Sequence, residues 1–222
     1  MKSLAIIPAR GGSKRLPAKH KLLFRGRPLI DHTILAAKES GAFDKVVVSS
    51  DDPEILQAAR KQGVEADSRP IELAGDTASV AQVCLELLER MPGYDLLCCL
   101  YATAPLRTAS DIRMSQEVLF KTQASAVICA TRYLHPAYQA LRPDDKNGWR
   151  LAFPELGEKR SQDLPAMKVD NGSCYWVRVG DFLKNKSFYL SPMALHEMPI
   201  ERSIDLDTPE DWALLQKLES VS

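Results

Sequence analysis

Basic residues and glycines near the N-terminus are the first group whose types and spacing could do chemistry. They lie in the segment 10–19, RGGSKRLPAK, within residues 1–30, which carry eight cations and no acid. Glycine lets backbone N–H groups approach oxygen atoms that a Cβ would hold away, and lysine and arginine offset negative charge. The segment therefore favours a polyphosphate such as a nucleoside triphosphate. Its spacing matches neither G-x-x-x-x-G-K-S/T nor G-x-G-x-x-G, and a solvated basic turn is the alternative interpretation.

Two acids near the C-terminus could hold a metal ion. Asp205 and Asp207 are two residues apart in the segment IDLDTP, so in an extended chain their side chains point to the same side. Magnesium usually binds one or two carboxylates together with phosphate oxygens, and this pair therefore complements a polyphosphate loop. The alternative is that Asp207 only helps to cap the following helix and that Asp205 is solvated.

Apolar runs alternate with amphipathic segments over the first 130 residues, which predicts a doubly wound α/β sheet. The predicted strands are 4–8, 45–49, 64–66, 95–101 and 125–130. The predicted helices are 28–41, 53–63, 80–91 and 110–121, the last capped by Ser110 and Asp111. Such sheets bind ligands beyond the carboxyl ends of their strands. The basic loop, Asp51 and Thr103 all fall at those ends, so we expect them to share a site.

The pattern changes after residue 131. Segment 131–175 holds four prolines and three glycines, which predicts an irregular excursion with short strands. A return strand at 173–179, a short helix at 181–186 and a closing helix at 208–219, capped by Thr208, complete the expected chain.

The composition argues against several classes of function. The 29 cations and 29 acids cancel, whereas a nucleic-acid binder is more often basic over a whole face. No apolar run in the sequence approaches the roughly 20 residues of a membrane span, and the run 4–7 is too short for the core of a signal peptide. Five cysteines at irregular spacing suit neither a disulfide framework nor a zinc site. We therefore expect a protein of the reducing cytoplasm that binds neither nucleic acid nor membrane.

Six ordered segments resemble the CMP-sugar synthetases, the cytidylyltransferases that act on sialic acid and related nonulosonic acids. They are IIPARGGSKRLPAKHK, VVVSSDDPEI, YATAPLR, RSQDLP, NGSCYW and IDLDTPEDW. YATAP and RSQD are most similar to the branch acting on pseudaminic acid, since the sialic acid branch typically has glutamine at Tyr101 and serine at Ala104. NGSCYW is instead similar to the sialic NG-x-x-Y pattern, where the pseudaminic branch usually has a D-A-G-Q-F-Y-W type of sequence. The resemblance implies pseudaminic acid as substrate, with N-acetylneuraminic or legionaminic acid as alternatives.

The resemblance also implies a fold, a reaction and an assembly. The fold is a Rossmann-like, mostly parallel sheet of the nucleotide-diphospho-sugar transferase type, forming one nucleotidyltransferase domain over 1–222. The reaction transfers CMP from CTP to the sugar's anomeric hydroxyl and releases pyrophosphate, with Mg²⁺ as cofactor. The assembly is a homodimer in which 131–175 is a dimerisation and sugar-site subdomain. A nucleotidyltransferase with another acceptor or base, and a nucleotide-binding regulatory module without turnover, stay open.

Matching motif positions imply the site residues. The nucleotide-binding residues are Arg10, Gly11, Gly12, Ser13, Lys14, Arg15, Lys19, Asp51 and Tyr101. The sugar-binding residues are Arg160, Gln162, Asn171 and Tyr175, and the metal ligands are Asp205 and Asp207. Arg10 and Lys19 are the expected catalytic residues, because they would neutralise the phosphates during transfer. Arg160 could instead pair with Glu155 or Glu158. His20 stands where the family usually has asparagine, and it either contacts a ligand or replaces that asparagine as a neutral hydrogen-bonding group.

Overall fold

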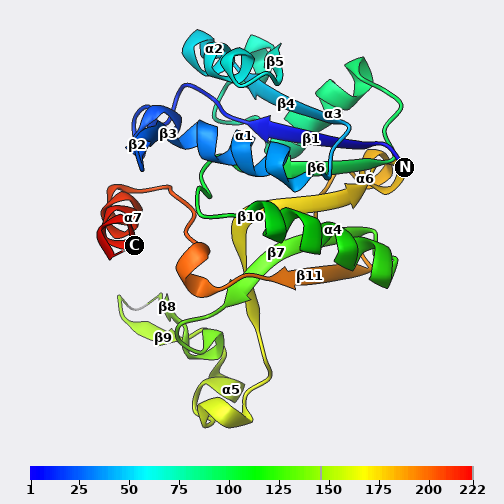
Figure 1. Cartoon of the computed structure of the whole chain (residues 1–222). Helices are drawn as coiled ribbons and strands as arrows, with labels where there is room; N and C mark the ends of the chain where they lie inside the picture. Colours follow the sequence, from blue (N-terminus) through cyan, green and yellow to red (C-terminus); the bar gives the residue numbers. More distant parts are fainter. Residues whose placement is uncertain (146, 222) are drawn as a thin grey trace.

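The structure is a computed structural model that describes residues 1–145 and 147–221. A seven-stranded sheet forms its centre. The strand order is β11-β7-β10-β6-β1-β4-β5 (Figure 1). The strands are β1 Ser3–Pro8, β4 Lys45–Ser50, β5 Glu65–Ser68, β6 Leu96–Leu100, β7 Ala126–Arg132, β10 Lys168–Arg178 and β11 Met193–Glu197. Neighbours pair in parallel except at β10, which is antiparallel to both β6 and β7. The expected mostly parallel sheet is confirmed.

Helices cover both faces of this sheet. They are α1 Leu29–Ser40, α2 Pro53–Lys61, α3 Val80–Arg90, α4 Ala109–Thr122 and α6 Val179–Asn185. The last helix, α7 Pro209–Val221, lies beside the sheet and packs with Phe24 and Leu29 in a separate small core (Figure 1). Alternate residues of β1 serve different cores: Ala5 and Ile7 pack with α1, α2 and α4, whereas Leu4 and Ile6 pack with α3 and α6. Because successive side chains of a strand point to opposite faces of the sheet, β1 contributes to the apolar core on each face, as a doubly wound fold requires.

A small unit projects away from the sheet between β7 and β10 (Figure 1). It contains β8 Leu141–Pro143, β9 Trp149–Leu151 and the short helix α5 Pro154–Gly157. Since β7 ends at Arg132 and β10 begins at Lys168, the described part of the predicted excursion that lies outside the sheet is 133–145 and 147–167. We call 133–167 the excursion below.

The structure corrects two local predictions. Thr108, two residues before Ser110, is the N-cap of α4, and Asp111 stays part of the cap as its partner in a reciprocal capping box. The return strand begins at Lys168 instead of residue 173 and runs antiparallel.

Three strand features were not predicted. They are β11 and the hairpin strands β2 Leu23–Phe24 and β3 Arg27–Pro28. These strands are short, and their residues do not form a continuous apolar run, so the pattern that marks buried strands is missing.

Two further features of the described chain bear on the composition argument. None of its helices, over 1–145 and 147–221, is long and apolar enough to cross a membrane. The five cysteines are free and buried.

Arg107 ties together three elements beneath the carboxyl end of β6. This arginine is 3% exposed, and burial lowers the pKa of its guanidinium. It donates to the carbonyl oxygens of Tyr101 and Ser173, at 3.2 and 2.7 Å, and to the hydroxyl of Thr33 at 3.0 Å. The loop after β6 is therefore joined to β10 and α1 by one side chain.

Replacing this side chain should destabilise the fold. Arg107→Met leaves two buried carbonyl groups without a charged donor, and we expect a loss of about 2 kcal/mol in the free energy of unfolding. Urea denaturation followed by circular dichroism measures this. Arg113→Met, at an exposed position of α4, is the matched control and should change stability little. Equal stability of the two variants would contradict the role given to Arg107.

Candidate active site

A cavity of about 320 Å³ opens at the carboxyl ends of β1 and β6. Polar and charged side chains share its wall with apolar ones such as Leu73, Val80 and Val83. The polar lining residues are Arg10, Arg15, Lys19, His20, Arg69, Asp76, Tyr101, Thr103, Asp205 and Asp207. The structure thus brings the basic loop and the C-terminal acid pair, which are almost 200 positions apart in sequence, to one place.

Glycine is required where the basic loop leaves β1. A Cβ on Gly11 would lie 2.9 Å from the Cβ of Asp52, so a larger residue would push the loop away from α2. The Gly11 N–H also donates to Asp51 Oδ1 at 2.9 Å. Asp51 therefore anchors the loop from outside, since it does not line the cavity.

One acid holds the tip of the loop. Asp76 pairs with Arg10 at 2.7 Å and with Lys14, and hydrogen bonds from Lys14 and Arg10 lower its pKa. Gly12, Ser13 and Lys14 line a hollow that adjoins the main cavity beside Asp76. The loop residues predicted to bind phosphate are thus gathered here around a carboxylate, which is itself an anion.

A second acid holds the other two cations of the loop. Lys19 Nζ lies 2.9 Å from Asp207 Oδ1 and 3.2 Å from the carbonyl oxygen of Leu206, while Arg15 lies 2.8 Å from Asp207 Oδ2. Burial raises the pKa of Asp207, but the contacts with Lys19 and Arg15 outweigh burial and leave it below the usual range. Asp207 is therefore ionised and joins the two ends of the chain.

Asp205 lies deeper than Asp207. Burial raises its pKa, and the nearby charge of Asp207 adds to this shift. Its Oδ1 is buried and has no hydrogen-bond partner. Gly172, at φ +64°, packs directly against this carboxylate, because a Cβ there would lie 2.3 Å from Asp205 Oδ2.

The two carboxylates fit a magnesium ion better than a metal with an all-protein cage. The unpartnered Oδ1 of Asp205 is a free hard-oxygen donor beside Asp207. Among residues 1–145 and 147–221, no cluster of three or more His, Cys, Asp or Glu side chains could hold a metal ion. Magnesium commonly takes one or two carboxylates and fills its other positions with water and substrate phosphate.

Two further residues of the cavity wall, His20 and Arg69, were only partly predicted from the sequence. His20 is 6% exposed, and burial, followed by the charges of Lys19, Arg69 and Arg10, lowers its pKa to about 3. It is neutral, as a replacement for asparagine would be. Arg69 was not predicted; it donates to the Ser49 carbonyl at 2.7 Å. Its position directly after β5, at a carboxyl end, was the available signal.

Tyr101 and Tyr175 lie side by side, but only Tyr101 lines the cavity. Their ring centroids are 5.0 Å apart. Tyr175 is buried, and its hydroxyl donates to Asp170 Oδ1 at 2.9 Å.

The other three predicted sugar residues lie elsewhere in this chain. Arg160 and Gln162 are exposed in the excursion, and Arg160 Nε lies 3.3 Å from Asp163 rather than from Glu155 or Glu158. Asn171 is buried, and its Nδ2 donates to Ser203 Oγ at 3.0 Å. These three residues are not among those lining the cavity.

Comparisons with known proteins agree with this geometry. A family model described as Cytidylyltransferase matches residues 4–149. The chain is 36% identical to a pseudaminic acid cytidylyltransferase of Campylobacter jejuni subsp. jejuni serotype O:2, over 100% of this chain and 98% of that protein. It is 38% identical to a CMP-N,N'-diacetyllegionaminic acid synthase of Legionella pneumophila subsp. pneumophila, over 98% of this chain and 96% of that protein.

A solved structure of a CMP:2-keto-3-deoxy-manno-octonic acid synthetase complexed with CTP has the same fold. It superposes with a TM-score of 0.72 over 100% of this chain and 98% of its own, at 20% identity.

Removing the acid that holds Arg10 and Lys14 should strengthen anion binding. Asp76→Asn frees both cations, and we expect inorganic pyrophosphate to bind about two- to tenfold more tightly, the modest size typical of exposed ion pairs. Isothermal titration calorimetry without metal measures this. Glu89→Gln, an exposed acid of α3, removes the same charge elsewhere. If pyrophosphate bound more tightly to the same extent in both variants, the change in net charge alone would explain the effect, and the role given to Asp76 would be contradicted.

Proposed function

The chain belongs to the cytidylyltransferase family, and we propose that it transfers CMP from CTP to the anomeric hydroxyl of a nonulosonic acid, with pyrophosphate released. The observation that carries the proposal is the single cavity in which the basic loop faces Asp205 and Asp207. Loop cations there match a triphosphate, and the acid pair matches its magnesium ion. We propose pseudaminic acid as the sugar, following the YATAP and RSQD segments.

The chemistry is an in-line substitution at the α-phosphate. A bond forms between the sugar's anomeric oxygen and the α-phosphorus while the bond from the α-phosphorus to the α–β bridging oxygen breaks. Pyrophosphate leaves, and the proton of the anomeric hydroxyl is released to water. Negative charge on the phosphate oxygens must be stabilised throughout, so positioned cations contribute most. Arg10 and Lys19 are the residues we propose for this role. Mg²⁺, held by Asp205 and Asp207, would neutralise further phosphate charge and polarise phosphoryl oxygens.

The pairing of the loop cations prepares them for this role. Asp76 pairs with Arg10 and Lys14, and Asp207 pairs with Lys19. Phosphate oxygens are the same kind of partner as these carboxylates, so a triphosphate can take over the contacts without moving the backbone far. Preorganisation of this kind lowers the cost of binding and of the transition state.

A homodimer would complete the sugar site. The excursion carries exposed apolar side chains, among them Leu134 at 72% and Trp149 at 71%, and large apolar side chains exposed on one small unit favour an interaction site. We propose that these side chains meet a second copy and that Arg160 and Gln162 reach the partner's cavity. The guanidinium of Arg160 would there bind the sugar's carboxylate as a bidentate fork. The free cysteines suit the reducing cytoplasm, which we propose as the location.

The reaction is tested by pyrophosphate release from CTP and Mg²⁺ across a panel of sugars, with product masses measured by mass spectrometry. The panel holds pseudaminic, legionaminic, N-acetylneuraminic, deaminated neuraminic and 3-deoxy-octulosonic acids. We expect release with pseudaminic acid. Release with another nonulosonic acid would change the sugar and keep the reaction, whereas no release with any sugar would contradict the proposed transfer.

The acid pair gives a prediction for activity. Asp207→Ala should lower turnover by about 100-fold or more, since charge stabilisation worth several kcal/mol is lost, while circular dichroism shows a retained fold. Glu210→Gln, an exposed acid three positions away, should retain turnover. Unchanged turnover in Asp207→Ala would remove Asp207 from the proposed metal site.

The excursion gives a prediction for assembly. Sedimentation velocity should show a dimer for the unaltered chain and a monomer for Trp149→Glu, because a charge would be buried in the contact. Leu183→Glu, at an exposed apolar position of α6, should remain dimeric. A monomeric unaltered chain would contradict the homodimer, and a dimeric Trp149→Glu would contradict its proposed surface.

A further inference from the structure

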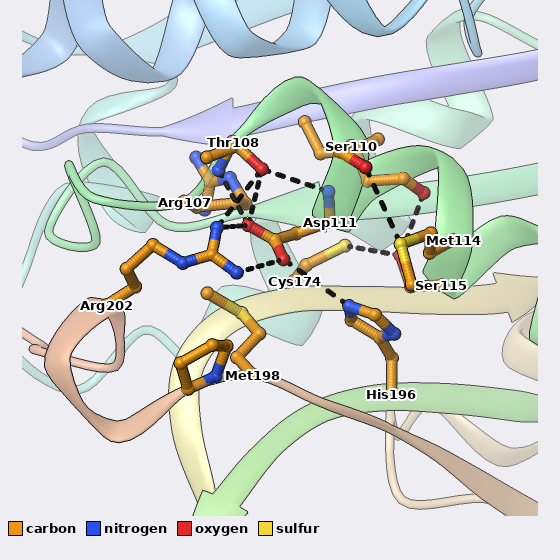
Figure 2. Close-up of polar contacts among 12 residues, drawn as sticks. Arg107, Thr108, Ser110, Asp111, Met114, Ser115, Cys174, His196, Met198 and Arg202 are labelled. Carbon is orange, nitrogen blue, oxygen red and sulfur yellow. Dashed lines mark hydrogen bonds and ion pairs between the residues drawn. The ribbon is translucent and has the colours of Figure 1, made fainter.

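A buried ionic cluster lies outside the cavity, at the start of α4 (Figure 2). At its centre is Asp111, which is 3% exposed. Its carboxylate accepts two hydrogen bonds from the Arg202 guanidinium, at 2.8 and 3.0 Å, and one from the Thr108 hydroxyl at 2.7 Å. His196 Nε2 lies 3.5 Å away, on β11. Figure 2 shows these side chains converging on the acid from three different elements.

The acid at the centre of this cluster is ionised. Burial raises the pKa of Asp111, but the contacts with His196 and Thr108 and the charge of Arg202 outweigh burial and hold it well below its usual range. A buried carboxylate needs a cation, because an uncompensated charge in the interior is strongly destabilising. Arg202 supplies that cation through a bidentate fork, the strongest and most directional arrangement available to a carboxylate.

Arg202 stands three residues before Asp205 on one continuous segment. It ends the short helix Ile200–Arg202, and the next residue, Ser203, accepts a hydrogen bond from Asn171 Nδ2 at 3.0 Å. Beyond Asp205, the Leu206 N–H donates to the Thr103 carbonyl at 2.8 Å. The segment is therefore fastened on both sides of Asp205.

The place of Asp205 between these fastenings is sterically narrow. Gly172 leaves room for the carboxylate only because it has no side chain. The neighbouring Asn171, which the family resemblance assigned to the sugar, instead holds Ser203. A shift of the segment by about 1 Å would move the Asp205 carboxylate away from Gly172. The three residues from Arg202 to Asp205 span at most about 10 Å. The ion pair between Arg202 and Asp111 is therefore close enough to fix the position of Asp205.

We infer that Arg202, through its ion pair with Asp111, is a positioning residue that holds Asp205 where it can bind the metal. The inference rests on the proposed function, because it takes Asp205 as a magnesium ligand. Residues that orient a metal ligand from behind commonly change metal affinity by about 10- to 100-fold when replaced. Arg202 itself bonds to Thr108 and Asp111, and it is not among the residues that line the cavity.

The test measures metal binding directly. Mn²⁺, a spectroscopic substitute for Mg²⁺, is titrated in the presence of saturating CTP and followed by electron paramagnetic resonance. Arg202→Met should raise the Mn²⁺ dissociation constant by about 10-fold or more, while CTP affinity without metal, measured by calorimetry, changes less than twofold. Arg202→Lys keeps the charge without the fork and should recover part of the loss. Arg113→Met on the exposed face of α4 is the control.

A second variant separates positioning from simple stabilisation. Arg202→Met leaves Asp111 charged and unpaired, and its melting temperature should fall. Asp111→Asn/Arg202→Met removes the stranded charge, so stability should recover while Mn²⁺ binding stays weak. Recovery of Mn²⁺ binding together with stability would overturn the inference, as would a Mn²⁺ dissociation constant unchanged in Arg202→Met.

The outcome also distinguishes this inference from the proposed function. If the unaltered chain binds Mn²⁺ with CTP but transfers CMP to none of the sugars, the transfer proposal fails and the positioning role is still measured. If the unaltered chain binds no Mn²⁺ with CTP, the metal assignment and the positioning role are both overturned, while the sugar panel decides the transfer separately.

Discussion

Repulsion among cations at one edge of the sheet is the constraint on which the rest of the site depends. The cations around the two adjoining hollows are Arg10, Lys14, Arg15, Lys19 and Arg69. Like charges placed this close together repel one another, although solvent screens the exposed members, Lys14 and Arg15. Two carboxylates offset this repulsion: Asp76 holds one pair, and Asp207 holds another. Because Asp207 belongs to the C-terminal segment, the contacts that neutralise the loop cations also join the N-terminal loop to the C-terminal segment.

The reversed strand β10 explains how the C-terminal acids reach that edge. β10 runs antiparallel between β6 and β7, and its register shifts between Asp170 and Tyr175. The shift marks an irregular stretch of β10, since five residues of β10 span two residues of β7. Gly172 lies in this stretch with a positive φ and leaves the space that Asp205 fills. The site is thus built from a parallel sheet's strand ends on one side and an irregularity in its one antiparallel strand on the other.

Runs of apolar residues in the sequence were enough to predict the buried strands of the fold. Strands buried on both faces appear as apolar runs, so β1, β4, β6 and β7 were found within a few residues. The basic loop and the acid pair were predicted to share a site, and they do. Arg69 was missed because its strand is short and half-polar. Arg160, Gln162 and Asn171 came from the family resemblance alone, and where a side chain points after an irregular segment depends on packing that no local spacing describes.

The neutral state of His20 has a consequence for how the cavity responds to acidity. With its pKa near 3, this imidazole takes up no proton between pH 5 and pH 8, the range in which histidine ordinarily titrates. Lysine and arginine side chains ordinarily stay protonated over that range. His20 therefore adds no pH-dependent charge to the cations facing a bound nucleotide, whereas the terminal phosphate has its second ionisation near pH 6. Over that range a change in acidity would alter the charge of the ligand without altering that of His20.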